Sequence, residues 1–110
     1  MSEIKELEGN ELEGLLKFNK RAAALFFYTP FCGTCKLAYK MLTIASEVVH
    51  DVPIYKCNVN TMGKFVQMWE ISSVPCLVYI RGNQIIKKQY ALHSVADVYQ
   101  DLKSLETLSR

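Results

Sequence analysis

A fully apolar run that leads into a closely spaced pair of cysteines is the feature that most constrains the fold of this chain. Residues 22–28 (Ala-Ala-Ala-Leu-Phe-Phe-Tyr) carry no charge, which is typical of a strand buried on both faces, as in a parallel sheet. Cys32 and Cys35 follow within a few residues, and apolar side chains then recur at helical spacing. The two thiols therefore stand where a strand gives way to a helix.

The start of a helix is a place where a cysteine becomes reactive. Its unpaired N–H groups and the positive end of its dipole favour a thiolate over a thiol and lower the cysteine pKa. We therefore expect Cys32 to be a nucleophile. Cys35 follows one turn later on the same side, close enough for the two sulfurs to form a disulfide. Such a pair can exchange electrons reversibly.

The composition favours one domain in a reducing compartment. A chain of 110 residues, 50% of them apolar, suffices for one core and not for two, so we expect a single domain over residues 1–110. The net charge of +2 includes no basic block or acidic tail, which indicates neither a nucleic-acid nor a membrane partner. With no secretory signal pattern and no bilayer-spanning apolar run, we expect a cytoplasmic monomer whose four cysteines are reduced.

The apolar periodicity also predicts the order of elements along the chain. Strands are expected over residues 4–7, 22–28, 54–59, 76–80 and 84–90, with helices over 10–18, 32–50, 61–72 and from 94 onward. Asn10, Thr61 and Ser94 are expected to cap three of the helices. A tight-turn signal, Gly82-Asn83, makes the last two strands an antiparallel hairpin, so the sheet is expected to be mixed.

This order, β-α-β-α-β-α-β-β-α, resembles that of the thioredoxin family across nearly the whole chain when two motifs are added. Residues 31–36 (Phe-Cys-Gly-Thr-Cys-Lys) are similar to the family's Trp-Cys-Gly-Pro-Cys-Lys, and residues 73–75 (Ser-Val-Pro) are similar to its cis-proline segment. The resemblance implies an α/β thioredoxin fold with a central mixed sheet flanked by helices. It also implies a thiol–disulfide oxidoreductase in which Cys32 attacks, Cys35 resolves, and the active-site turn contains Phe31, Gly33, Thr34 and Lys36.

The resemblance further implies how the protein meets its partners. Pro75 is expected in cis beside the sulfurs, and the segment Val74, Pro75 and Cys76 is expected to offer backbone hydrogen bonds to a bound substrate. The expected partners are proteins that carry disulfides, together with a flavin-dependent reductase or another thiol electron donor. The implied role is electron transport in cell redox homeostasis, with no bound cofactor and no metal.

One departure from the family concerns a proton acceptor. Phe26 stands where thioredoxins usually carry a buried aspartate that is thought to help move the proton of the resolving cysteine. Lys56 still occupies the position that usually faces this aspartate. Two interpretations of Lys56 stay open: it is a cation that favours a thiolate nearby, or it extends from its strand into solvent.

Two further departures lie in the active-site turn and in a nearby loop. Thr34 replaces the usual proline, which frees a backbone N–H and loosens the turn, so we expect a more oxidising potential unless the change is simply tolerated. Tyr90 lies near a usual glycine, where its ring either narrows the substrate groove and the range of partners or caps the core.

Two cysteines remain outside the active-site pair. Cys76 follows Pro75 where threonine is common, so it either substitutes for threonine sterically or adds a third thiol to the site. Cys57 lies in the middle of a predicted strand and is expected to be buried and inert.

Three functions are therefore open at this point. The favoured one is a protein-disulfide reductase that uses Cys32 and Cys35. The second is a weakly active module for partner binding or redox sensing, because Phe26 removes the usual acid chemistry. The third is an iron–sulfur or metal site formed by Cys32, Cys35 and Cys76.

Overall fold

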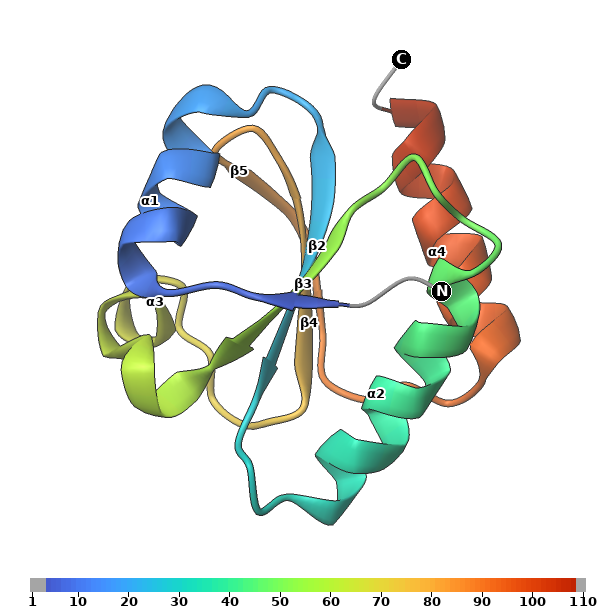
Figure 1. Ribbon diagram of the computed structural model, residues 1–110, viewed down its shortest axis with the longest axis horizontal. Coiled ribbons are helices and arrows are strands. Elements are labelled where there is room, and N and C mark those ends of the chain that lie inside the picture. The colour runs from blue at the N-terminus through green and yellow to red at the C-terminus, as the bar shows by residue number, and fades with distance from the viewer. Residues whose placement is uncertain (1–3, 109–110) are drawn as a thin grey trace.

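A computed structural model describes residues 4–108 and contains a five-stranded sheet with helices on both faces (Figure 1). The strands are β1 (Lys5–Glu6), β2 (Ala22–Tyr28), β3 (Ile54–Asn58), β4 (Cys76–Arg81) and β5 (Gln84–Gln89). The helices are α1 (Gly9–Phe18), α2 (Gly33–Ser46), a 3-10 turn η1 (Val59–Thr61), α3 (Gly63–Met68) and α4 (Val95–Leu108). Residues 1–3 and 109–110 of the single domain that the sequence predicts lie outside the described range.

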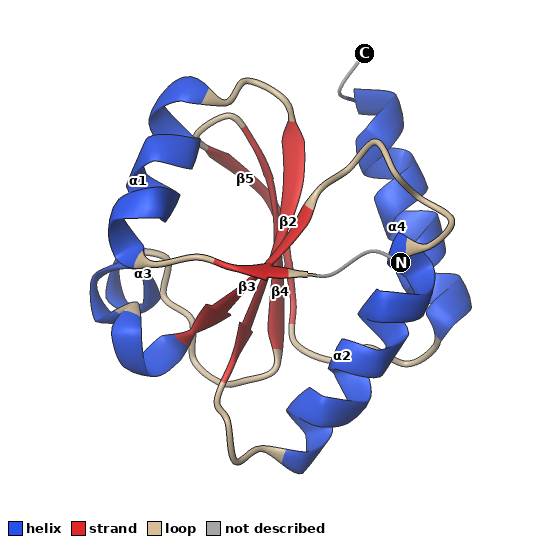
Figure 2. Cartoon of the chain, viewed as in Figure 1, coloured by secondary structure: helices blue, strands red, loops and turns tan. Residues whose placement is uncertain are grey.

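The sheet combines parallel and antiparallel pairs, as the sequence predicts. Its strand order is β1-β3-β2-β4-β5, with β1, β3 and β2 parallel and with β4 and β5 antiparallel to their neighbours. The parallel strands are joined by crossovers through α1 and α2, each of which returns the chain to the end of the sheet where the next parallel strand begins (Figure 2). The apolar run Ala22–Tyr28 is the central strand, and its first six residues are buried.

The alternation of β2 side chains divides the core into two layers. Ala22, Ala24 and Phe26 face α2 and α4, whereas Ala23, Leu25 and Phe27 face α1 and α3. In Figure 1 these helix pairs lie on opposite sides of the sheet. The chain passes from the C-terminal end of β2 directly to the start of α2, where the cysteine pair lies.

The first helix begins earlier than predicted, so the capping role given to Asn10 was wrong. Glu8 is the N-cap residue, and its backbone N–H donates to the Glu11 carboxylate over 2.9 Å. This bond lowers the pKa of Glu11, with a further contribution from Lys5. Glu8 and Glu11 thus cap the helix reciprocally, two residues before the predicted cap at Asn10.

The second helix ends at Ser46 rather than near residue 50, which corrects the predicted boundary. The backbone N–H groups of Val48 and Val49 both donate to the Ala45 carbonyl, and this turn lets Val49 enter the core. The apolar side chains that the helix buries also differ from those that are most prominent in the sequence. Leu37 and Ile44 are more than half exposed.

The third helix is shorter than predicted at both ends. Thr61 does not cap it, because its hydroxyl donates to the Asn58 carbonyl and closes the preceding 3-10 turn. The helix ends at Met68, and Glu70 then adopts a left-handed conformation with φ of 53°. The last helix does follow its predicted cap, because the Asp97 backbone N–H donates to the Ser94 hydroxyl over 3.1 Å.

The remaining strand boundaries agree with the predictions to within one or two residues. Gly82 closes the β4–β5 turn with φ of 62°, a value that favours glycine. Over the described part of the chain, no helix combines the length and the apolar character needed to cross a bilayer.

Candidate active site

The cysteine pair occupies the first turn of α2. Cys32 is the N-cap residue, and its sulfur accepts a hydrogen bond from the Cys35 backbone N–H over 3.2 Å. The Thr34 hydroxyl oxygen lies 3.1 Å from the same sulfur. Both cysteines are free thiols in this structure, so it represents the dithiol state. The helix start thus supplies the polar contacts that a thiolate at Cys32 needs.

The pKa values of the two thiols are shifted in opposite directions. Hydrogen bonds from the Cys35 thiol and then from the Thr34 hydroxyl lower the pKa of Cys32. Burial, followed by the hydrogen bond to Cys32, raises the pKa of Cys35 to about 11. Cys35 is 2% exposed, whereas Cys32 is only partly buried. One sulfur is therefore accessible and easily ionised, and the other holds its proton.

The rest of the active-site turn faces solvent. Phe31 is 97% exposed, and Gly33, Thr34 and Lys36 are exposed as well. A large aromatic side chain with this exposure next to Cys32 offers apolar contact area to another molecule.

A groove lies on one side of α2, between the helix and the cis-peptide loop. The Val74–Pro75 peptide bond is cis, and Pro75 lines the groove together with Thr34, Leu37 and Tyr90. The groove has a volume of about 230 Å³. Val74 and Pro75 are partly buried, and Val74 packs against the core layers on both faces.

Tyr90 contributes both to this groove and to the loop beneath it. Its hydroxyl donates to the Glu70 carbonyl over 3.3 Å and accepts from the Ser72 backbone N–H over 3.4 Å. Its ring lines the groove beside Pro75. The ring is therefore fixed against the 70–72 loop while it shapes the space next to the cysteines.

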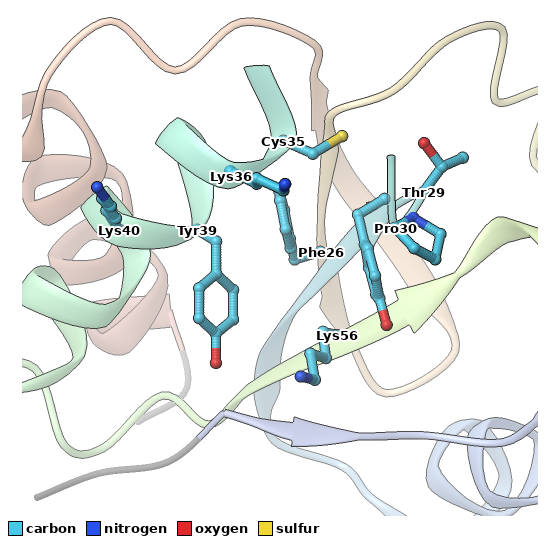
Figure 3. Close-up of a pocket in the computed structure, with 9 residues that line it drawn as sticks. Phe26, Thr29, Pro30, Cys35, Lys36, Tyr39, Lys40 and Lys56 are labelled. Carbon is cyan, nitrogen blue, oxygen red and sulfur yellow. The ribbon is translucent and has the colours of Figure 1, made fainter. Parts of the chain in front are cut away.

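A second cavity lies on the other side of α2 and reaches Cys35. Its volume is about 360 Å³, and Phe26, Cys35 and Lys56 line it from β2, α2 and β3 (Figure 3). The other lining residues are Tyr28, Thr29, Pro30, Lys36, Tyr39 and Lys40. None of these described lining residues is a carboxylate, so Phe26 leaves this side of the buried thiol without an acidic neighbour.

Lys56 lines this cavity, and its side chain contacts other residues instead of extending freely into solvent. Its side chain is 30% exposed, and its amino group lies 4.0 Å from the Glu6 carboxylate and 5.3 Å from the centre of the Tyr39 ring. The same carboxylate accepts a hydrogen bond from the Tyr28 hydroxyl over 2.7 Å. The sequence analysis missed Glu6, Tyr28 and Tyr39, because strand order brings Glu6 and Tyr28 to Lys56 and the packing of α2 on the sheet adds Tyr39.

Cys76 and Cys57 lie on the opposite face of the sheet from Cys35. Both are completely buried, and Phe27 lies between them in the strand register, opposite Cys57 on β3 and Cys76 on β4. Two strand spacings of about 4.8 Å place their backbones too far apart for a disulfide. Burial raises the pKa of Cys76 to about 11 and that of Cys57 to about 12.

This placement separates Cys76 from the active-site pair, which weakens the hypothesis of a three-cysteine metal site. Within residues 4–108, no group of three or more histidine, cysteine, aspartate or glutamate side chains is arranged to hold a metal ion. Cys76 is completely buried, which agrees with the interpretation that it replaces threonine sterically.

Comparison with known proteins places the chain among redox proteins of similar architecture. A family model described as Thioredoxin matches residues 3–104. The thioredoxin-like protein YusE of Bacillus subtilis is 41% identical over 100 residues, which cover 91% of this chain and 92% of that protein. Thioredoxin of Haemophilus influenzae is 28% identical over 90 residues, which cover 81% and 84% of the two chains.

Solved structures agree with the sequence comparison. The oxidised form of mitochondrial thioredoxin 3 from Saccharomyces cerevisiae superposes with a TM-score of 0.80 at 26% identity, over 93% of this chain and 95% of that one. A mutant thioredoxin from Halobacterium salinarum gives a TM-score of 0.82 at 19% identity, over 94% and 91%. The mixed sheet and its flanking helices are thus those of the architecture that the sequence resembles.

Proposed function

The chain belongs to the thioredoxin family, and from this premise we propose that it reduces disulfides in other proteins. Membership and the adjacent cysteines support a thiol–disulfide oxidoreductase in general. The specific proposal assigns the attack to Cys32 and the resolving step to Cys35. The observation that carries it is the position of the two thiols at the start of α2, where Cys32 is accessible and hydrogen-bonded and Cys35 is buried.

The first step is an attack by the Cys32 thiolate on one sulfur of the substrate disulfide. A bond forms between Cys32 and that sulfur, the substrate disulfide breaks, and the other substrate sulfur leaves as a thiolate that takes up a proton. The hydrogen bonds from Thr34 and Cys35 support this step, because they lower the pKa of Cys32 and so increase its thiolate fraction.

The second step releases the substrate. Cys35 loses its proton and attacks the Cys32 sulfur, so the mixed disulfide breaks and a Cys32–Cys35 disulfide forms. The two electrons of the protein dithiol have then moved to the substrate, which leaves as a dithiol. An electron donor, either a flavin-dependent reductase or another thiol, must reduce the new disulfide before the next turnover.

Substrate contacts are proposed around the cysteine pair. Pro75 lines the groove beside α2, and we assign the backbone of Val74, Pro75 and Cys76 to substrate hydrogen bonds, with exposed Phe31 offering further apolar area next to Cys32. Tyr90 narrows the same groove and favours a restricted set of protein partners. We place the protein, as one monomeric domain, in cytoplasmic electron transport and redox homeostasis.

The test is reduction of insulin disulfides by the purified protein with dithiothreitol, followed by turbidity. Wild type is expected to accelerate precipitation, Cys32→Ser to lose this activity, and Cys35→Ser to accumulate a mixed disulfide visible on a non-reducing gel. A Cys57→Ser variant is the matched control, because its thiol lies on the other face of the sheet. Activity that survives in Cys32→Ser contradicts the assignment.

A second function is supported by one specific observation. Phe26 is 1% exposed and fills the position of the expected carboxylate, so the cavity beside Cys35 is mainly apolar. A slow resolving step would make the protein a module that holds or senses partners rather than a reductase. In the insulin assay, an inactive wild type that still forms a mixed disulfide through Cys32 identifies this alternative.

A further inference from the structure

We propose that the Glu6 carboxylate accepts the proton that Cys35 loses in the resolving step, with the Tyr28 hydroxyl as the relay. The inference rests on the proposed function, because it names the base for its second chemical step. A base is required there, since burial holds the proton on Cys35 near neutral pH.

The strand register brings an acidic side chain to the position where one is needed. Phe26 on β2 lies opposite Lys56 on β3, and Lys56 lies opposite Glu6 on β1. Residues directly opposite each other in neighbouring strands share a face of the sheet. Lys56 therefore has an aromatic ring on one side and a carboxylate on the other, so its acidic neighbour comes from the edge strand.

Tyr28 connects this carboxylate to the cavity beside Cys35. Its ring stacks on Phe26, with centroids 5.9 Å apart and an angle of 6° between the planes, so the ring is held along the cavity wall. Its hydroxyl donates to the Glu6 carboxylate over 2.7 Å, which leaves the oxygen able to accept a hydrogen bond from water. A proton that reaches this oxygen can be passed on to Glu6 along a bond that already exists.

The cavity provides the path from the buried thiol to this hydroxyl. Cys35 and Tyr28 both line it, and its volume of about 360 Å³ holds several water molecules at about 30 Å³ each. Exposed Lys36 and Lys40 at its rim connect it to solvent. Water can therefore bridge the Cys35 sulfur and the Tyr28 oxygen.

The charged and titratable groups around Glu6 suit this role. They are Tyr28 on β2, Lys56 and Cys57 on β3 and Tyr39 on α2, whereas the neighbouring Lys5 pairs with Glu11. Lys56 offers positive charge to the carboxylate, and Tyr28 orients it. Glu6 is also partly exposed, with 36% of its side chain accessible, so a proton that it has accepted can be returned to solvent.

The step balances as a proton transfer coupled to a thiol exchange. The Cys35 proton passes through water to Tyr28 while the Tyr28 proton passes to Glu6, which becomes a neutral carboxylic acid. The Cys35 sulfur then bonds to Cys32, the bond between Cys32 and the substrate breaks, and the released substrate thiolate takes a proton from solvent. Glu6 later loses its proton to water.

The experiment measures the rate at which a preformed mixed disulfide between Cys32 and a chromogenic aromatic thiol is resolved. Glu6→Gln keeps a side-chain oxygen that can accept from Tyr28 but removes the base, and Tyr28→Phe removes the relay. Both are expected to slow resolution about a hundredfold at neutral pH, the lower end of a general-base effect. The deficit is expected to shrink to about twofold or less near pH 11, where Cys35 ionises without help.

Glu13→Gln is the matched control, because Glu13 also pairs with a lysine, Lys64, but on the other side of the molecule. The inference is wrong if Glu6→Gln matches wild type at neutral pH, or if its rate is reduced by the same factor at every pH. A failure of the proposed function looks different, because wild type itself would then fail to form or resolve the mixed disulfide.

Discussion

The Thr34 hydroxyl oxygen lies 3.1 Å from the Cys32 sulfur, at the residue where related proteins place a proline that has no such group. This contact and the Cys35 backbone N–H both reach the sulfur from the same turn. A hydroxyl that donates to a thiolate stabilises the ionised form, so Thr34 contributes to the lowered pKa of Cys32. The substitution therefore adds a specific interaction to the nucleophile as well as freeing the turn.

Replacing Thr34 with valine tests this contribution. Thr34→Val keeps the shape of the side chain and removes the hydroxyl, so the pKa of Cys32 should rise and its thiolate fraction at neutral pH should fall. We expect alkylation of Cys32 by iodoacetamide to slow by a factor of about three. Thr43→Val in the same helix, whose hydroxyl donates to the Tyr39 carbonyl, should leave the rate unchanged. Equal rates in all three proteins would contradict the role of Thr34.

The pH dependence of thiolate absorbance should separate the two cysteines. In the reduced protein, Cys32 should titrate below the range of an ordinary cysteine, whereas the Cys35 thiol, with a pKa raised to about 11, should remain protonated. Cys32→Ser should lose the low titration, and Cys35→Ser should keep it, because a serine hydroxyl can donate in place of the Cys35 thiol and the Thr34 hydroxyl and the backbone N–H remain. An unchanged low titration in Cys32→Ser would assign the thiolate to another residue.

The second helix shows which part of the fold the sequence could predict. Its existence and its start at the cysteine pair follow from helical periodicity, and both are confirmed. Periodicity does not identify the buried face of the helix, because two apolar stripes run along the helix. Leu37 and Ile44 are large and exposed, whereas the helix buries Leu42 together with two small residues, Ala38 and Ala45. Small residues allow close packing between elements, a requirement that hydrophobicity alone does not reveal.

The site shows a similar division. The cysteine motif identifies Cys32 and Cys35 because local spacing determines their geometry. The contacts of Lys56 with Glu6 depend on β1 pairing with β3, which brings together residues 50 positions apart. No local pattern in the sequence encodes that strand order, so the lysine could not be assigned a partner before the structure was known.

A glycine at position 70 should stabilise the protein. Glu70 adopts φ of 53°, a conformation that costs a non-glycine residue about 1 kcal/mol. Its tertiary contacts use the carbonyl oxygen, which accepts from Tyr90 and Lys88, so a glycine retains them. We expect Glu70→Gly to raise the free energy of unfolding by about 0.5 kcal/mol in urea, after the larger entropy of the unfolded chain is subtracted. Glu70→Ala is the control and should give no increase.

Replacing Cys76 with threonine should preserve reductase activity and change the pH dependence of stability. Because burial raises the pKa of Cys76 to about 11, the unfolded chain loses this proton first. The stabilisation is complete below about pH 8.5 and is lost towards pH 11, at up to about 1.4 kcal/mol per pH unit. Any deficit in unfolding free energy of Cys76→Thr relative to wild type should therefore shrink between pH 7 and pH 10 in urea titrations. A loss of activity would instead show a direct catalytic role for Cys76.

An aspartate at position 26 should make Glu6 unnecessary. Phe26→Asp places a carboxylate opposite Lys56 in the register of β2 and β3, at the cavity that contains Cys35. Loss of the buried ring should cost about 3–5 kcal/mol, which a domain with about 5–15 kcal/mol of stability can tolerate. If the variant retains its fold by circular dichroism, it should release the mixed disulfide faster than wild type, and Glu6→Gln added to it should have less than about a twofold effect. A double variant that is slowed as strongly as Glu6→Gln alone would mean that the two carboxylates do not serve the same proton.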